Sequence, residues 1–441
     1  MGNAQDGLSR RRFLAGATGA AAALPLLSTG AGLAGCSAAD SSSPATGMGG
    51  LPTSLEQLAE LARQEGRGQP LVMCDLAAVD QNTAVLLNWS RENGFALRPA
   101  LKSFQSPELC AYILQALPEP RGMVFHLGTV DEMLQAAPPD TDLLMGYPPT
   151  VGELEQYLIK GRPRLGPRQR LRILIDSVAL AERTAELARA TELPLPLDVA
   201  LEFDSGMGRG GVDSAAELTA LIRVLEQNRG LLQLGAVLCY DGHATLNGNA
   251  LYRQLVAQTA QDRYAGFLAQ LAAEGGHLYD EDTLIRNGPG SSNYRNWAGS
   301  DVANEISPGS AFMFAGYLGA FDNEGLAPAI TQASPLMRIT GDHPSVPLTQ
   351  DTLPGAQEEE VIIKAGPWPG SDFAHPPGMR QDELSGGGFA LVAPKGALAL
   401  GDYVLMRPQQ SGDGIDPFGA LLAIREGHVV ARWRTFARWS A

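Results

Sequence analysis

The chain has 441 residues, of which 44% are hydrophobic and 18% are charged, so it can bury a large core and is not disordered as a whole. Lys and Arg number 33 against 48 Asp and Glu, a formal net charge of −15 that argues against a nucleic-acid partner, because phosphate backbones are bound by clustered cations. Chemistry that needs an amine nucleophile has only four candidates: Lys102, Lys160, Lys364 and Lys395.

Residues 1–35 are predicted to be an export signal. The run Ser9-Arg10-Arg11-Arg12-Phe13-Leu14 matches the twin-arginine signature, and a stretch rich in Ala, Gly and Leu follows. The stretch ends at Leu33-Ala34-Gly35-Cys36, which resembles a bacterial lipobox with Cys36 as the lipidated residue; the alternative is an ordinary cysteine near a conventional cleavage site. Residues 36–50 read as a flexible tether. We therefore expect a periplasmic or cell-surface lipoprotein that touches the membrane only through its lipid anchor.

From residue 70 onward, short apolar runs alternate with longer amphipathic stretches, which is the rhythm of an α/β fold. Helical patterns cover residues 79–93, 179–191, 215–228 and 250–274. Strands are predicted at eight places: Phe95–Leu101, Met123–His126, Asp142–Met145, Leu171–Ile175, Leu197–Phe203, Leu234–Tyr240, Thr283–Asn287 and Asn304–Ser307. Helices separate most of them, and the last connection is short and loop-like. The series predicts a (β/α)8 TIM barrel over about residues 70–325, in a domain that spans 51–330.

After residue 330, Pro, Gly and Thr punctuate short alternating runs. The runs are Leu336–Thr340, Val361–Ala365, Phe389–Val392, Gly401–Arg407, Ala420–Arg425 and Val429–Trp433. This spacing predicts an antiparallel β domain over residues 331–441.

Lys102 ends the first predicted barrel strand. Catalytic groups of barrel enzymes come from the carboxyl ends of the strands, and an apolar setting lowers the pKa of an amine and makes it nucleophilic. On position alone, a surface lysine that caps the strand fits equally well.

Three further stretches follow predicted strands and carry suitable chemistry. Asn287-Gly288-Pro289-Gly290-Ser291-Ser292 offers backbone N–H groups and hydroxyls to a phosphate, although Gly/Ser loops are common. The stretch from Glu202 to Gly211 contains Arg209. Its guanidinium can face a ring nitrogen or a carboxylate of a ligand, or it can be an ordinary solvated side chain. Tyr240 and His243 are of acid–base types, although a lone histidine is more often structural.

These stretches, in this order, resemble the fold-type III pyridoxal-phosphate enzymes, and in particular the D-threonine aldolase and D-serine dehydratase-like group with its alanine-racemase-like N-terminal half. The resemblance covers about residues 68–441. It implies a pyridoxal 5'-phosphate cofactor, an amino acid substrate and a homodimer. Matched motif by motif, it assigns Lys102 to the Schiff base, Arg209 to the D-x-G-M-G-R-x-G segment, and Tyr240 with His243 to the Y-x-G-H segment. Gly290, Ser291 and Ser292 fall in the phosphate loop.

The sequence departs from this group where its metal-dependent members carry a His-x-Asp or His-x-Cys pair after a proline. Here the matching run is Pro408-Gln409-Gln410-Ser411-Gly412, with Gln in place of His. The group's S-E-E-H-G segment is replaced by Leu384-Ser385-Gly386-Gly387-Gly388-Phe389. Asp413 and Asp416 are hard-cation ligand types, but loop carboxylates are more often solvated. We therefore expect no metal site.

The sequence predicts an exported enzyme with D-threonine aldolase-like lyase activity on D-3-hydroxy amino acids. Two alternatives stay open: an amino acid racemase or dehydratase of the same fold, and a non-catalytic lipoprotein that binds pyridoxal phosphate or another ligand.

Overall fold

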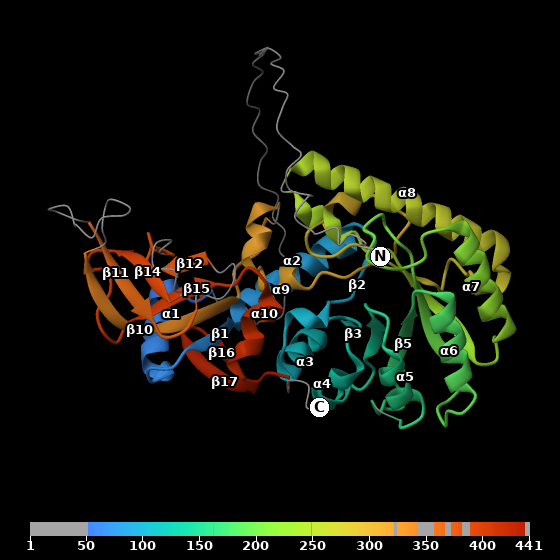
Figure 1. Cartoon of the computed structure of the whole chain (residues 1–441), viewed down its shortest axis with the longest axis horizontal. Coiled ribbons are helices and arrows are strands. Elements are labelled where there is room, and N and C mark those ends of the chain that lie inside the picture. The colour runs from blue at the N-terminus through green and yellow to red at the C-terminus, as the bar shows by residue number, and fades with distance from the viewer. Residues whose placement is uncertain are drawn as a thin grey trace, which may run out of the picture. The chain divides into compact units, whose positions relative to one another are not determined.

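The computed structural model describes residues 52–161, 163–247, 249–321, 324–342, 357–366, 372–381 and 389–436. The predicted export signal, Cys36, the tether and residues 384–388 lie outside these ranges. Within them the chain forms a parallel barrel and a second sheet that is mostly antiparallel (Figure 1). This arrangement confirms the predicted TIM barrel followed by a β domain.

The barrel is built from eight parallel strands in the order β2-β9-β8-β7-β6-β5-β4-β3. An isolated parallel bridge between Ala100 and Met123 joins the two ends of this sheet. Most strand residues are buried, as expected where a core fills the inside and helices cover the outside. The strands are β2 (Ala96–Leu97), β3 (Arg121–Val124), β4 (Asp142–Met145), β5 (Arg170–Ile175), β6 (Leu197–Glu202), β7 (Leu232–Leu238), β8 (Ile285–Asn287) and β9 (Glu305–Ile306).

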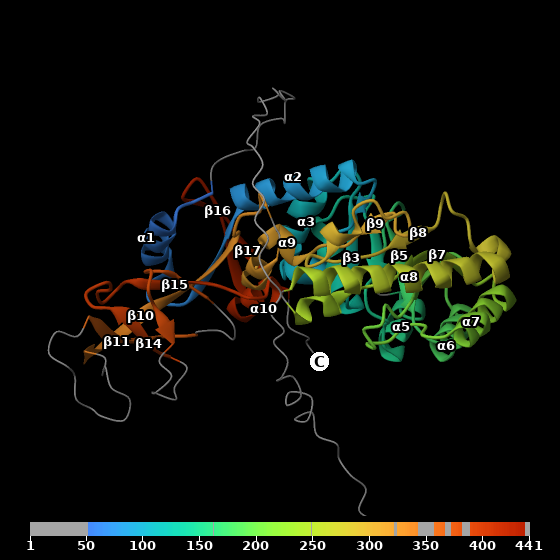
Figure 2. The same ribbon diagram turned by 90° about the horizontal axis from the view of Figure 1, so that it is seen from above.

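Helices surround the barrel, and the long helix α8 lies on its outside (Figure 2). Ser106, Ser177 and Ser214 cap three of them by accepting a hydrogen bond from a backbone N–H of the first turn. Between β8 and β9 the structure has only a short 3-10 helix, η6 (Tyr294–Trp297), as the loop-like pattern predicted. The helices are α2 (Leu76–Glu92), α3 (Pro107–Gln115), α4 (Val130–Ala136), α5 (Val151–Leu158), α6 (Val178–Ala188), α7 (Ala215–Gln227) and α8 (Ala250–Glu274).

Buried ion pairs cross the interior of the barrel. The fully buried Arg98 donates from Nε to Glu305 Oε1 at 2.6 Å and from Nη1 to Asp142 Oδ1 at 2.8 Å. Asn287 Nδ2 donates both to Glu305 Oε1 at 2.9 Å and to Ser307 Oγ at 2.7 Å. Through this chain of contacts the ion pairs hold Asn287 and Ser307, two residues at the carboxyl ends of strands, in fixed orientations.

The second sheet collects the C-terminal strands. They are β10 (Ile330–Asp342), β11 (Glu358–Ile363), β12 (Asp372–His375), β13 (Arg380–Gln381), β14 (Ala390–Pro394), β15 (Tyr403–Arg407), β16 (Ala420–Arg425) and β17 (His428–Arg434). The short helices α9 (Ser310–Met313) and η7 (Gly316–Ala320) precede this sheet, and α10 (Ser411–Ile415) and η8 (Asp416–Phe418) follow β15.

The N-terminal segment belongs to this second sheet, although the sequence placed it with the barrel. Strand β1 (Leu71–Asp75) pairs antiparallel with β10 and parallel with β16, and all five of its residues are buried. Helix α1 (Leu55–Gly66) buries Leu58 and Leu61 against the same sheet. Apolar strands look alike in sequence whichever sheet they join, so only the tertiary pairing separates β1 from the barrel strands.

Candidate functional site

Lys102 lies just beyond the first barrel strand. Strand β2 ends at Leu97, earlier than predicted, and Lys102 sits in the short 3-10 helix η2 (Leu101–Ser103) that follows the bridge at Ala100. Its Nζ lies 4.0 Å from the centroid of the Phe125 ring at the end of β3. A Cβ on Gly412 would stand 2.6 Å from the Lys102 carbonyl oxygen, so α10 can pack against η2 only with glycine at this position.

The surroundings of Lys102 make its amine easier to deprotonate. The side chain is accessible from two adjoining cavities, but the walls around it remove much of its water. This burial lowers the pKa of Lys102 to about 8; the positive charge of Arg209 contributes in the same direction, and the carboxylate of Asp413 opposes it. An amine with this pKa is a competent nucleophile near neutral pH.

The smaller of the two cavities has a volume of about 210 Å³ and gathers the predicted site residues from the carboxyl ends of several strands. Lys102, Arg209, Tyr240, Gly290 and Ser291 all line it. The lining also includes residues that were not predicted from the sequence as site residues, among them Phe125, Thr245, Ser307, Gly309 and Tyr317.

The guanidinium of Arg209 lies over two aromatic rings. Its guanidinium carbon lies 4.6 Å from the Tyr240 ring centroid and 5.1 Å from that of Tyr147. Its Nη2 and Nε donate to Glu202 Oε1 at 2.5 Å and 2.9 Å. Burial raises the pKa of Glu202, and the Arg209 charge only partly offsets that effect. The ion pair with Glu202 and the contacts with the two rings fix the orientation of the Arg209 guanidinium, which faces the cavity.

Tyr240 is clamped between two glycines. A Cβ on Gly290 would lie 2.9 Å from Tyr240 Cε2, and a Cβ on Gly242 would lie 2.3 Å from Cε1. Burial raises the pKa of Tyr240 well above its usual range, although Arg209 acts in the opposite direction. The hydroxyl therefore stays protonated and can donate a hydrogen bond or a proton.

The loop after β8 forms a cup of hydroxyls and backbone amides. Ser291 Oγ accepts hydrogen bonds from the backbone N–H of Gly309 at 2.9 Å and of Ala311 at 3.1 Å. Tyr317 approaches from η7; burial raises its pKa, and hydrogen bonds with Ser310 and Ser291 partly offset this. The Ser291 and Tyr317 hydroxyls can donate to a phosphate. Ser292 is buried but does not line the cavity.

His243 is the second predicted residue that does not line the cavity. It lies in the 3-10 helix η4 (Gly242–Leu246), from which Thr245 rather than His243 reaches the cavity wall. Its Nδ1 is buried and has no hydrogen-bond partner among the described residues. The adjacent Asp241 is fully buried, accepts hydrogen bonds from Asn293 and Trp297, and has a pKa raised by burial.

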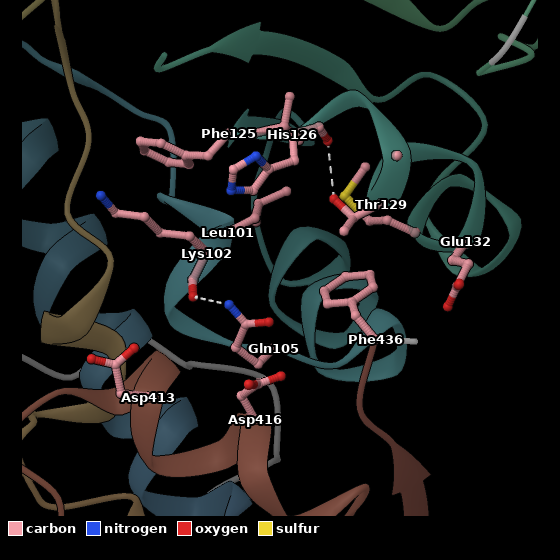
Figure 3. A pocket seen from close by; sticks show the side chains of 13 residues that line it. Leu101, Lys102, Gln105, Phe125, His126, Thr129, Glu132, Asp413, Asp416 and Phe436 are labelled. Atoms are coloured by element: carbon pink, nitrogen blue, oxygen red, sulfur yellow. Dashed lines mark hydrogen bonds between the residues drawn. The ribbon is translucent and has the colours of Figure 1, made fainter. Parts of the chain in front are cut away.

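A second, larger cavity of about 440 Å³ adjoins the first and shares Lys102 and Phe125 with it (Figure 3). No local sequence pattern predicted a second cavity beside Lys102. Its lining includes one imidazole, that of His126, which ends the strand predicted at Met123–His126 and so carries the same strand-end signal as Lys102. The carboxylates along its wall are Glu132, Asp413 and Asp416.

The segment after β15 supplies Gln410 to the smaller cavity. The neighbouring Gln409 donates from Nε2 to Asp372 Oδ2 at 2.5 Å, so only the second of the two glutamines reaches the site. Among the residues that the structure describes, no group of three or more His, Cys, Asp or Glu side chains is arranged to hold a metal ion.

None of the helices in the described ranges has the length and apolar character needed to span a bilayer.

The fold is similar to those of several solved structures. D-threonine aldolase from Filomicrobium marinum has a TM-score of 0.69 at 21% identity, covering 83% of this chain and 95% of that chain. D-threo-3-hydroxyaspartate dehydratase from Delftia sp. has a TM-score of 0.65 at 20% identity, covering 84% and 98%. Alanine racemase from Bacillus anthracis has a TM-score of 0.59 at 15% identity, covering 83% and 97%. At these identities the likeness shows a shared fold. No curated protein matches the chain by sequence.

Residues 74–315 match the family model for the alanine racemase N-terminal domain. Together with the barrel and the second sheet, this match places the chain in the class of fold-type III pyridoxal-phosphate enzymes, whose cofactor is pyridoxal 5'-phosphate. Because the match spans more than half of the 441 residues, the chain belongs to the alanine racemase N-terminal domain family.

Proposed function

We propose that this chain is an exported, lipid-anchored pyridoxal-phosphate lyase that acts on D-3-hydroxy amino acids in the manner of a D-threonine aldolase. The observation that carries the proposal is the opening of Lys102 into the same cavity as Arg209, Tyr240 and the Ser291 cup. The neighbours with aldolase and dehydratase names support the substrate class.

The residues present fit the cofactor. Lys102 supplies the amine that would bind its aldehyde carbon, and its lowered pKa favours that attack. The hydroxyls of Ser291 and Tyr317 supply donors for the phosphate, and Arg209 supplies a fixed cation for the ring. When bound, the cofactor delocalises the electron pair left at the substrate's α-carbon when a bond there breaks.

The side chains of this site would then divide the remaining tasks. Tyr240 stays protonated and can return a proton to the α-carbon. Gln410 can hydrogen-bond the substrate carboxylate through its amide, which needs no metal ion. Both groups face the cavity that Lys102 enters.

Borohydride reduction of the cofactor-loaded protein, followed by peptide mapping, tests the proposal. The reduced cofactor should be found on the peptide that contains Lys102. A label on Lys160, Lys364 or Lys395 would overturn the assignment. If no lysine is labelled, the protein does not bind the cofactor covalently, and the alternative of a non-catalytic ligand-binding protein is favoured.

Export and anchoring rest on the twin-arginine run and on the Leu33-Ala34-Gly35-Cys36 box. Replacing Arg10 and Arg11 by Lys should block export, and Cys36→Ala should release the protein from the membrane fraction. A Cys36→Ala protein that still sediments with membranes contradicts lipidation at Cys36.

We also propose a homodimer, as the family resemblance implies. Three exposed leucines support it: Leu246 at the end of η4, and Leu251 and Leu255 in α8, are 79%, 62% and 59% exposed. Light scattering of the purified protein should give twice the monomer mass, and a monomer at micromolar concentration would contradict this.

A further inference from the structure

The smaller cavity is too small for both cofactor and substrate. Its volume is about 210 Å³, whereas pockets that enclose a drug-sized ligand measure roughly 300–1,000 Å³. An amino acid joined to the cofactor therefore needs the adjoining cavity of about 440 Å³. Lys102 and Phe125 form the boundary that the two cavities share.

His126 faces this larger cavity close to Lys102. It follows Phe125, whose ring lies 4.0 Å from Lys102 Nζ. Figure 3 shows the imidazole beside the Phe125 ring, above the Lys102 side chain as drawn. Of the described residues that line either cavity, His126 is the only histidine.

The surrounding charges keep this imidazole able to accept a proton. Burial lowers the pKa of His126, the Lys102 charge lowers it further, and Glu153 acts in the opposite direction. The other titratable groups that line the cavity are Glu132, Asp413 and Asp416. Glu132 lies 3.2 Å from Arg434, which offsets its charge. At neutral pH the ring is therefore mainly uncharged.

Two groups that line the smaller cavity, Tyr240 and Gln410, are poorly suited to accept a proton from a substrate hydroxyl. Tyr240 is held protonated by burial. Gln410 stands where related metal-dependent enzymes carry a histidine, and an amide is not a base.

We propose that His126 is the acid–base residue for the β-hydroxyl of the substrate, taking over the role that a metal site has in other members of the group. The inference rests on the proposed function. His126 accepts the hydroxyl proton as the Cα–Cβ bond breaks, and Cβ leaves as an aldehyde. The bonding pair stays with the α-carbon, which is later protonated there. The imidazolium then returns its proton to solvent.

The variant His126→Asn tests this role, with His277→Asn as the matched control. His277 lies in the 3-10 helix η5 (Gly276–Leu278) and pairs with Glu226, outside both cavities. Cleavage of D-threonine by His126→Asn should fall about 10²–10⁴-fold, the usual contribution of a general base. Exchange of the α-proton of D-alanine in D₂O should persist in both variants, because that substrate has no β-hydroxyl.

The pH profile separates catalysis from support of the fold. In the wild type, kcat/KM for D-threonine should fall on the acid side as His126 is protonated, and this limb should vanish in His126→Asn. A second measurement needs no turnover: in NMR titrations of the cofactor-free protein, Lys102→Met should raise the pKa of the His126 ring, because a nearby positive charge is removed.

The outcomes are distinct. Wild-type cleavage rates in His126→Asn, or an acid limb that persists in that variant, overturn the role of His126. A wild type that exchanges the α-proton of D-alanine but does not cleave D-threonine also overturns it, while the cofactor chemistry stands. If the wild type shows neither exchange nor a reduced adduct on Lys102, the proposed function itself fails, and this inference with it.

Discussion

The two cavities that meet at Lys102 are walled by different kinds of side chain. In the smaller one, Gly290 and Gly309 approach so closely that a Cβ would collide, and Ser291 is tied to two backbone amides. In the larger one, exposed or half-buried groups such as His126 and Asp413 face open space. The closely packed wall of the smaller cavity suits a cofactor, whose shape does not change. The larger cavity instead presents groups that can exchange protons with a substrate. Experiments that perturb each side separately test this division.

Among substitutions in the smaller cavity, the largest effect on turnover is expected at Tyr240. Tyr240→Phe keeps the ring between Gly242 and Gly290 but removes the hydroxyl, so turnover should fall about 10²–10³-fold with little loss of stability. His243→Asn should change turnover by no more than about twofold, because His243 does not line the cavity. Steady-state kinetics on both variants measure this, and the reverse ranking would show that η4 rearranges in the working enzyme.

Substitutions in the loop after β8 should affect cofactor affinity. Ser291→Ala removes a hydroxyl that can donate to the cofactor phosphate, and a hydrogen bond to a charged group contributes ~1.5–3 kcal/mol. We expect the cofactor to bind about tenfold more weakly, since ~1.4 kcal/mol corresponds to tenfold in a dissociation constant. Ser292→Ala is the control, because Ser292 does not line the cavity. Equal losses in the two variants, measured by cofactor titration, would contradict the assignment of the cup.

A smaller effect, of opposite sign in two variants, is expected on the pKa of Lys102. The Arg209 charge lowers this pKa and the Asp413 charge raises it. Arg209→Gln should therefore raise the pKa and move capture of the cofactor aldehyde to higher pH, because only the neutral amine attacks. Asp413→Asn should lower the pKa and move capture to lower pH. Both shifts can be measured from the rate at which the imine absorbance appears after cofactor is added, recorded from pH 6 to pH 10. Shifts of the same sign in the two variants would contradict the placement of one of the two charges.

No effect is expected from removing divalent metals. The segment after β15 presents Gln410 to the site, and manganese or zinc is usually held by imidazole, thiolate or several carboxylates. Turnover of D-threonine before and after exhaustive chelation measures this. Loss of activity that manganese or zinc restores would contradict it.

Several elements were predictable from local sequence. The alternation of apolar runs and amphipathic stretches predicted the barrel strands from β3 to β9, because parallel strands buried on both faces are continuously apolar. Lys102, Arg209, Tyr240 and Ser291 were predictable as site residues because each follows a strand at the carboxyl end, and those ends gather at one face of a barrel.

Other features depend on contacts between distant parts of the chain. The pairing of β1 with β10 and β16 joins residues more than 250 positions apart, and no local pattern specifies it. His126 carried the same strand-end signal as Lys102, but its value lies in the cavity that α4 and α10 enclose around it.

The sequence by itself determined the fold class, the order of the strands and the chemical types available at their ends, because periodicity and composition are local properties of the chain. Only the tertiary structure decided that Tyr240 and not His243 lines the cavity, that Ser291 and not Ser292 does, and that a second cavity opens beside Lys102. Neighbouring residues in a loop or a 3-10 helix point in different directions, and which of them faces a cavity is set by the packing of segments far away in the sequence.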